Sequence, residues 1–242
     1  VSVADVHREV VETGHGLITR EVDGQRLTTT AGVLAEERRM LAFAREGRGS
    51  CMPLAWERKI QNELLSDEQR SAVRHLWDSL DRVMLLRGAA GVGKTTLMKE
   101  AVEGIEAAGT KVYCFAPSAS ASRGTLREEG FGEADTLASL LSNPELQNKV
   151  QAGVIWVDEA GQIGTRDLGR LFEIADKAQA RVLLTGDIRQ HGPVARGDAM
   201  RLLQEQAGCH AAEVVEIRRQ SGEYREAVKA LSQGETIRGF DR

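Results

Sequence analysis

The chain has 242 residues, of which 41% are hydrophobic and 28% charged, enough for one large α/β domain or one domain with a modest appendage. This composition excludes a disordered chain, a collagen and a coiled-coil rod, and no apolar run is long enough for a membrane span. The formal net charge of −4 argues against a uniformly basic surface but is compatible with a local nucleic-acid groove.

Residues 1–60 are expected to form an accessory, mainly helical N-terminal region. A helix is predicted from Ala31 to Arg45 because apolar residues recur there at roughly helical spacing, and Thr29 or Thr30 can cap it. Glycines and a proline then mark 46–55 as a connection. The chain begins without Met and lacks the basic-then-apolar pattern of a signal peptide, so we expect a cytoplasmic fragment of a longer protein.

Residues 61–242 alternate between short apolar runs and helical stretches. Ser66 and Gln69 have the spacing of a capping box at the start of a helix that reaches about Leu80. The predicted strands are Val83–Leu86, Lys111–Phe115, Val154–Val157, Arg181–Thr185 and Glu213–Ile217, and the predicted helices are 94–108, 119–129, 135–142, 166–178 and 196–207. This alternation predicts an α/β fold in which helices cover both faces of a parallel sheet.

A glycine-rich loop lies between the first of these strands and the next helix. Its residues are Gly88, Ala89, Ala90, Gly91, Val92, Gly93, Lys94, Thr95 and Thr96, in the pattern G-x-x-x-x-G-K-[ST]. The glycines let successive backbone N–H groups point at phosphates, and the following helix adds its positive N-terminal end. Lys94 is predicted to contact the β- and γ-phosphates and Thr95 to bind Mg²⁺. This phosphate loop therefore predicts ATP and Mg²⁺ as cofactors.

Two adjacent acids follow the strand Val154–Val157. Asp158 is placed to complete the Mg²⁺ shell, and Glu159 to orient or deprotonate the attacking water. Adjacent acids also occur on ordinary surface turns, but the end of a buried strand favours the catalytic interpretation. The strand Arg181–Thr185 likewise leads to Gln190, which can hydrogen-bond both the γ-phosphate and the water; the alternative is a polar turn with a chance Gln.

Together, these segments resemble a superfamily 1 DNA helicase of the RecD-like branch, and most closely the helicase region of MobF-class conjugative relaxases, the TraI/TrwC kind. The resembling stretch runs from about Leu65 to Phe240. Leu65-Ser-Asp-Glu-Gln69 resembles the family's Q motif, which implies that Gln69 reads adenine. Asp158-Glu-Ala-Gly161 matches motif II, residues 186–199 resemble motif III and its extension, and Glu216-Ile-Arg-Arg219-Gln220 looks like motif IV, whose Arg219 would touch the γ-phosphate.

The resemblance also implies contacts with single-stranded DNA. Ala116-Pro-Ser-Ala-Ser-Ala121 is similar to motif Ia, and Thr136 opens a run that looks like the next DNA-contacting motif. Ser118, Ser120 and Thr136 are the candidate contacts, made mostly to phosphates and with few cations involved. The family implies ATP-driven movement along single-stranded DNA in the 5′ to 3′ direction.

The sequence departs from the whole family in two respects. Motifs of the second RecA-like domain are missing, so that domain of the parent chain is an expected partner, and the fragment is expected to be monomeric and only weakly active. The nucleophilic Tyr and His cluster of a relaxase are missing too, so we expect no DNA nicking. The alternatives are a nucleotide- and DNA-binding module without turnover, a RecD-like repair helicase lobe, or, disfavoured because no acceptor lid is visible, a phosphate-loop kinase.

Overall fold

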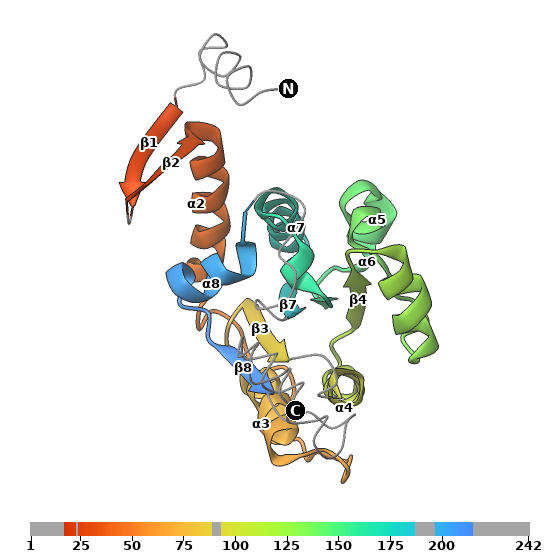
Figure 1. Ribbon diagram of the computed structural model, residues 1–242. Helices are drawn as coiled ribbons and strands as arrows, with labels where there is room; N and C mark the ends of the chain where they lie inside the picture. The colour runs from red at the N-terminus through yellow and green to blue at the C-terminus, as the bar shows by residue number, and fades with distance from the viewer. Residues whose placement is uncertain (1–16, 23, 89–92, 187–196, 215–242) are drawn as a thin grey trace, which may run out of the picture.

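A six-stranded parallel sheet forms the centre of the computed structural model, which describes residues 17–22, 24–88, 93–186 and 197–214 (Figure 1). Its order is β5-β4-β6-β7-β3-β8, and every neighbouring pair is parallel. The strands are β3 (Val83–Gly88), β4 (Val112–Ala116), β5 (Asp135–Thr136), β6 (Val154–Val157), β7 (Arg181–Gly186) and β8 (Ala211–Val214). All six end at the same edge, where open α/β sheets bind ligands. The predicted α/β class is confirmed.

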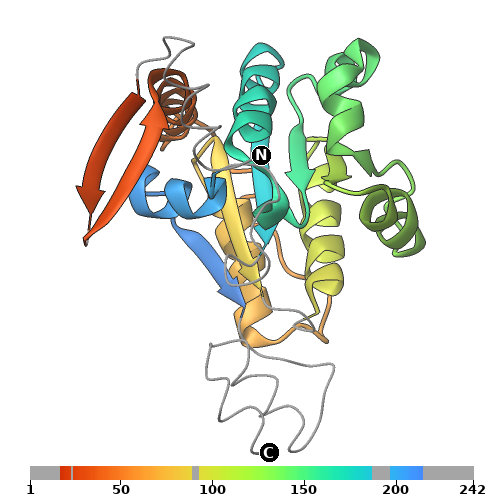
Figure 2. The ribbon, with the colours of Figure 1, turned by 45° about the horizontal axis from the view of Figure 1, so that its top comes forward.

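Helices cover both faces of this sheet (Figure 2). One face carries α2 (Ala31–Glu46), α5 (Leu137–Ser142), α7 (Thr165–Lys177) and α8 (Ala199–Ala207), which lie above the strands in Figure 1. The other face carries α3 (Asp67–Asp78), α4 (Lys94–Ala107) and the π-helical turn η1 (Ser120–Leu126). The sheet thus separates the buried side chains into two clusters, and helices cover each of them.

The central strands are apolar on both faces because each face is covered. In β3, Val83 and Leu85 belong to the cluster under α7, whereas Met84 and Leu86 belong to the cluster under α3 and α4. None of these four side chains is more than 2% exposed. The alternation of side chains across a strand therefore supplies both clusters from one short run.

The N-terminal part contains a β-hairpin that the sequence analysis did not predict. Its strands are β1 (Leu17–Val22) and β2 (Gln25–Thr30), and they are rich in Thr and charged residues rather than alternating apolar ones. The helix α2 begins after the predicted cap Thr30, whose hydroxyl accepts the Val33 N–H at 3.3 Å. It packs against α7 and α8, and Met40 and Ala44 join the sheet's core. The boundary near residue 60 stays a prediction.

Several other elements differ in extent from the predicted ones. The predicted helix 135–142 is divided, because Asp135 and Thr136 pair with β4 before α5 begins at Leu137. The helix α6 (Pro144–Lys149) was not predicted. The predicted helix 119–129 contains the π-helical η1, and β8 begins at Ala211 rather than Glu213. None of the described helices is long and apolar enough to cross a bilayer.

Candidate nucleotide-binding site

The described ends of the phosphate loop meet at the carboxyl edge of the sheet. β3 ends at Gly88, and α4 begins at Lys94 with Gly93 as its N-cap. Lys94 and Thr95 are both half-buried. Residues 89–92 lie outside the described residues, so their contacts with phosphates stay predictions. The strand–loop–helix order that the motif requires is present.

Gly93 is the position in this loop where glycine is needed. Its φ of +75° lies in the left-handed region that favours glycine, and a Cβ there would lie 2.7 Å from Gln69 Nε2. Gln69 donates from Nε2 to the Gly93 carbonyl at 3.3 Å, and its Oε1 accepts the Ser66 N–H at 2.9 Å. Gln69 is only 2% exposed, so it joins the start of α3 to the phosphate loop. Its predicted reading of adenine stays a prediction.

Asp158 lies at the carboxyl end of β6, as the sequence analysis expected. Its backbone N–H donates to the Phe115 carbonyl at 2.9 Å, which fixes it beside β4. The side-chain Oδ1 is buried and has no hydrogen-bond partner among the described residues. Burial raises the pKa of Asp158, while the charge of Lys94 and the N–H of Glu159 oppose that shift. Asp158 and Lys94 therefore lie within electrostatic reach of each other although 64 positions separate them in the sequence.

The backbone of Glu159 has an unusual conformation. Its φ of 54° and ψ of 31° are left-handed, which is uncommon for a residue other than glycine. The half-buried side chain accepts a hydrogen bond at Oε2 from Gln162 Nε2 at 3.2 Å. Such backbone strain occurs preferentially at functional sites, where the surrounding structure maintains it. The conformation turns Glu159 away from the strand direction immediately after Asp158.

The carboxyl end of β7 packs against the turn that follows Asp158 and Glu159. A Cβ on Gly186, the last residue of β7, would lie 2.9 Å from the Gly161 backbone nitrogen and 3.0 Å from Met200 Sδ. The end of β7 thus lies beside the residues that follow Asp158 and Glu159. Gln190 and Arg219 lie outside the described residues, so their catalytic roles stay predictions.

The residues at this edge fit a magnesium ion. A buried carboxylate oxygen without a partner is costly unless a cation or a donor satisfies it. Oxygen donors such as Asp158 Oδ1 and the Thr95 hydroxyl are the kind that Mg²⁺ prefers, together with waters and substrate phosphates. The chemistry of this donor set therefore agrees with the cofactor predicted from the sequence.

The three candidate DNA contacts lie at the carboxyl ends of β4 and β5. The Ser118 hydroxyl accepts the Ala121 N–H at 3.1 Å, and Ser120 is exposed in η1. The Thr136 hydroxyl accepts the Ser139 N–H at 3.0 Å and caps α5. Two of the hydroxyls therefore have a local structural role, and DNA contact by all three stays a prediction.

Sequence reasoning missed a charged residue among these hydroxyls. Arg123, in η1, forms an ion pair with Asp135 at 2.8 Å and donates to the Ser139 hydroxyl at 3.2 Å. Its guanidinium is half-exposed at the same edge of the sheet. Only the fold brings η1 beside β5, so the sequence spacing gave no indication of this cation.

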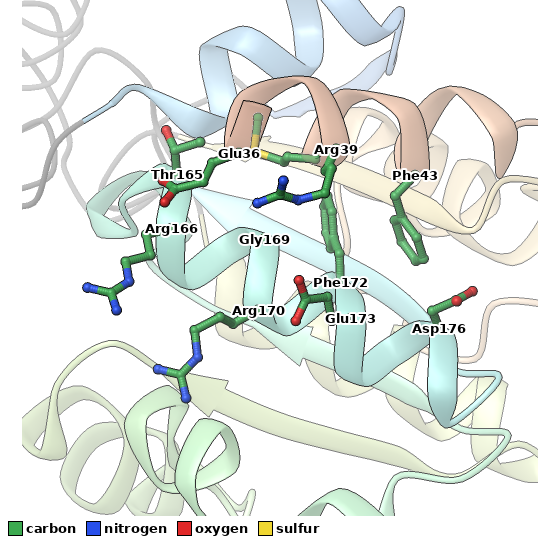
Figure 3. A pocket seen from close by; sticks show the side chains of 11 residues that line it. Glu36, Arg39, Phe43, Thr165, Arg166, Gly169, Arg170, Phe172, Glu173 and Asp176 are labelled. Atoms are coloured by element: carbon green, nitrogen blue, oxygen red, sulfur yellow. The ribbon is translucent and has the colours of Figure 1, made fainter. Parts of the chain in front are cut away.

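A cavity of about 390 Å³ lies elsewhere, between α2 and α7 (Figure 3). Its floor contains Phe43 and Phe172, whose rings stack with centroids 4.7 Å apart. At one end Thr165 is 1% exposed, and its hydroxyl has no partner among the described residues. The mixed charges at the rim include Glu36 and Arg39. None of the predicted nucleotide residues lines this cavity.

Comparison with known proteins shows what the chain is similar to. The signature of the AAA domain matches residues 64–242. The chain is 30% identical over 221 residues to the multifunctional conjugation protein TraI of Escherichia coli (strain K12). This match covers 86% of the chain and 12% of TraI. It is 35% identical over 194 residues to the conjugal transfer protein TraA of Rhizobium radiobacter, covering 78% of this chain and 17% of TraA. The resemblance predicted from the motifs is confirmed.

The chain spans less than a fifth of the length of these relatives. Among solved structures, it superposes on the Pif1 helicase from Candida albicans with a TM-score of 0.52 and 20% identity, covering 71% of this chain and 44% of Pif1. A second structure, of Pif1 helicases at forked double-stranded DNA, superposes with a TM-score of 0.51 and 20% identity. The match covers 70% of this chain and 48% of that chain. These structures share the fold described above.

Proposed function

The chain belongs to the AAA domain family, and from that premise we propose that it is the ATP-binding and hydrolysing lobe of a DNA helicase that moves 5′ to 3′ along single-stranded DNA in a conjugative relaxase-helicase. The similarity to TraI and TraA supports the conjugative setting. The partner that completes the motor is a second RecA-like domain of the parent chain. That domain would supply an arginine finger, a contribution on the order of 10³–10⁵ in rate in comparable enzymes.

The observation that carries this proposal is the buried, unpartnered Oδ1 of Asp158 within electrostatic reach of Lys94. A purely structural carboxylate in this position would have a hydrogen-bond donor, because burial without one is costly. An unsatisfied acceptor next to a phosphate-loop lysine is expected where a cation and a triphosphate complete the site.

Each of the chain's own residues then has a defined task. Lys94 binds the phosphates, and Gly93 allows the left-handed backbone turn before α4, where a Cβ would collide with Gln69. Thr95 and Asp158 would hold Mg²⁺, which when bound would neutralise charge on the phosphate oxygens. Glu159, turned by its left-handed backbone, accepts a proton from the attacking water.

An ATPase assay with and without single-stranded DNA tests the proposal. We expect slow hydrolysis that DNA stimulates, since DNA binding is the event that the motor converts into movement. Nucleotide and DNA binding without turnover would support an assembly module instead, and phosphate transfer to a metabolite would support a kinase. DNA affinity should fall only slightly with salt, because few cations contact phosphates.

Two variants assign the roles of single residues. Lys94→Ala should abolish nucleotide binding, whereas Lys99→Ala, an exposed lysine on the same helix, should not. Glu159→Gln should retain nucleotide binding and lower the hydrolysis rate by about 10²–10⁴, the contribution of a positioned general base. Hydrolysis by Glu159→Gln at the parent's rate would exclude this residue as the base.

A further inference from the structure

The turn that follows Asp158 brings the side chains of Glu159 and Gln162 together. This turn is the 3-10 helix η2 (Ala160–Gln162), in which the Gln162 N–H donates to the Glu159 carbonyl at 3.0 Å. Side chains three positions apart eclipse each other in such a helix. The Gln162 amide therefore lies beside the Glu159 carboxylate, and its Nε2 donates to Oε2 at 3.2 Å. Because an ionised carboxylate only accepts hydrogen bonds, the amide nitrogen is the atom that must face it.

Neighbouring elements hold the backbone of this turn in place. Ala160 is 1% exposed, and Met200, which reaches the turn from α8, is 2% exposed. A Cβ on Gly186 would lie 2.9 Å from the Gly161 nitrogen and 3.0 Å from Met200 Sδ, so β7, α8 and the turn pack without space between them. This packing maintains the left-handed backbone of Glu159, which would be strained on its own.

The side chain of Glu159 keeps a freedom that the packing does not remove. It is only half-buried, and a glutamate side chain rotates about several bonds. A general base acts only when its oxygen lies within hydrogen-bond reach of the proton that it takes. The Gln162 amide occupies Oε2, and a carboxylate can accept through both of its oxygens, so Oε1 can still take a proton from water.

We infer that Gln162 is a positioning residue for hydrolysis, whose amide holds the Glu159 carboxylate in the orientation in which Oε1 takes the proton of the attacking water. The inference rests on the proposed function, because Gln162 acts only through Glu159. A base that is oriented beforehand loses little entropy at the moment of reaction. Gln162 is exposed, so we expect its contribution to be that of one modest hydrogen bond, about three- to tenfold in rate.

Steady-state ATP hydrolysis by the 242-residue chain, with Mg²⁺ and saturating single-stranded oligodeoxythymidine, tests this inference. Gln162→Met keeps the length of the side chain but removes the amide. We expect kcat to fall about three- to tenfold. The KM for ATP, the affinity for a non-hydrolysable ATP analogue and the melting temperature should stay unchanged, because Glu159 takes part only in hydrolysis. Gln162→Lys, which returns a donor, should restore kcat to within about twofold of the parent.

The matched control is Gln179→Met. Gln179 is also an exposed glutamine whose Nε2 donates to a residue three positions earlier, in this case to the Asp176 carbonyl at 2.9 Å. It follows the end of α7, at the opposite edge of the sheet from Asp158. We expect this variant to hydrolyse ATP with the parent's kcat and KM.

The contact itself can be observed without nucleotide. The side-chain amide of Gln162 has its own signal in a nitrogen–proton correlation spectrum, identified by its loss in Gln162→Met. We expect this signal to shift in Glu159→Gln, because a charged acceptor becomes a neutral one, and the Gln179 signal to stay in place. A Gln162 signal that does not respond to Glu159→Gln would overturn the inference.

Each result of the hydrolysis assay decides a separate question. An unchanged kcat in Gln162→Met shows that the amide does not position the base, and a higher kcat shows that it restrains the base; either result makes the inference wrong. A lower kcat together with weaker analogue binding or a lower melting temperature assigns Gln162 to the binding site or the fold instead. These results leave the proposed function intact if the parent hydrolyses ATP and Glu159→Gln does not. A parent without hydrolysis disproves both.

Discussion

The contact between α3 and α4 can be tested by adding a single methyl group at Gly104. This glycine lies in the interior of α4, and the indole of Trp77 from α3 occupies the space where a side chain would be. A Cβ on Gly104 would lie 2.1 Å from Trp77 Cζ2, and ordinary contacts begin at 3.4 Å, so the two must separate by roughly 1.3 Å. The indole is 1% exposed and donates to the Ala101 carbonyl at 3.1 Å, which leaves it little freedom to move.

The magnitude follows from two opposing effects of Gly104→Ala. Alanine favours a helix interior over glycine by about 0.5–1 kcal/mol. Overpacking a filled core costs about 1–3 kcal/mol, and displacing the indole from its carbonyl partner costs about 1 kcal/mol more. The net loss in the free energy of unfolding is then about 2 kcal/mol. For a domain of this size, that lowers the melting temperature by about 4–8 °C.

Gly169→Ala is the matched control. Gly169 lies in the interior of α7 and nothing lies within 4 Å of its Cβ position, so only the helix preference acts. We expect this variant to gain about 0.5–1 kcal/mol, measured like Gly104→Ala by urea unfolding followed with circular dichroism. A Gly104→Ala variant as stable as the parent would refute the packing argument. Because α3 carries Gln69 and α4 carries Lys94, we also expect this variant to bind nucleotide more weakly.

Three further predictions concern buried polar groups. Burial raises the pKa of Asp158 above its ordinary value of 3.8 in the folded state, so its carboxylate destabilises the fold at neutral pH. Asp158→Asn should therefore raise the melting temperature at neutral pH, with the gain fading as the pH falls toward 3.8, and should abolish hydrolysis. Arg181 donates to three backbone carbonyls, so Arg181→Lys should cost about 2 kcal/mol in urea unfolding, and an unchanged midpoint would contradict this. Burial raises the pKa of Cys114 to about 12 and of Cys209 to about 11, so a thiol reagent should modify only Cys51 until the chain unfolds.

Local sequence patterns were sufficient to predict the elements that build the candidate nucleotide site. The capping box of Ser66 and Gln69 is present, with both reciprocal hydrogen bonds. The strand before Gly88, the helix that begins at Lys94 and the strand that delivers Asp158 all lie within a few residues of their predicted positions. Short-range periodicity and capping specify such elements because the interactions that define them join residues close in sequence.

Pairings between distant segments were not visible in the sequence. The hairpin β1–β2 was missed because its strands lack an alternating apolar face, and β5 because two residues pairing with β4 have no periodicity. The bonds from Glu100 to the loop 61–62 and the space that Gly104 leaves for Trp77 join different elements.

The sequence by itself predicted which residues would hold a triphosphate, and it determined the order of the strands and helices that flank the predicted site, because backbone geometry and capping are local. The tertiary structure alone decided the strand order β5-β4-β6-β7-β3-β8 and brought Asp158 within reach of Lys94. Periodicity shows which face of an element is buried but not which partner covers it. That choice depends on side-chain shapes and hydrogen bonds that form only once distant parts of the chain meet.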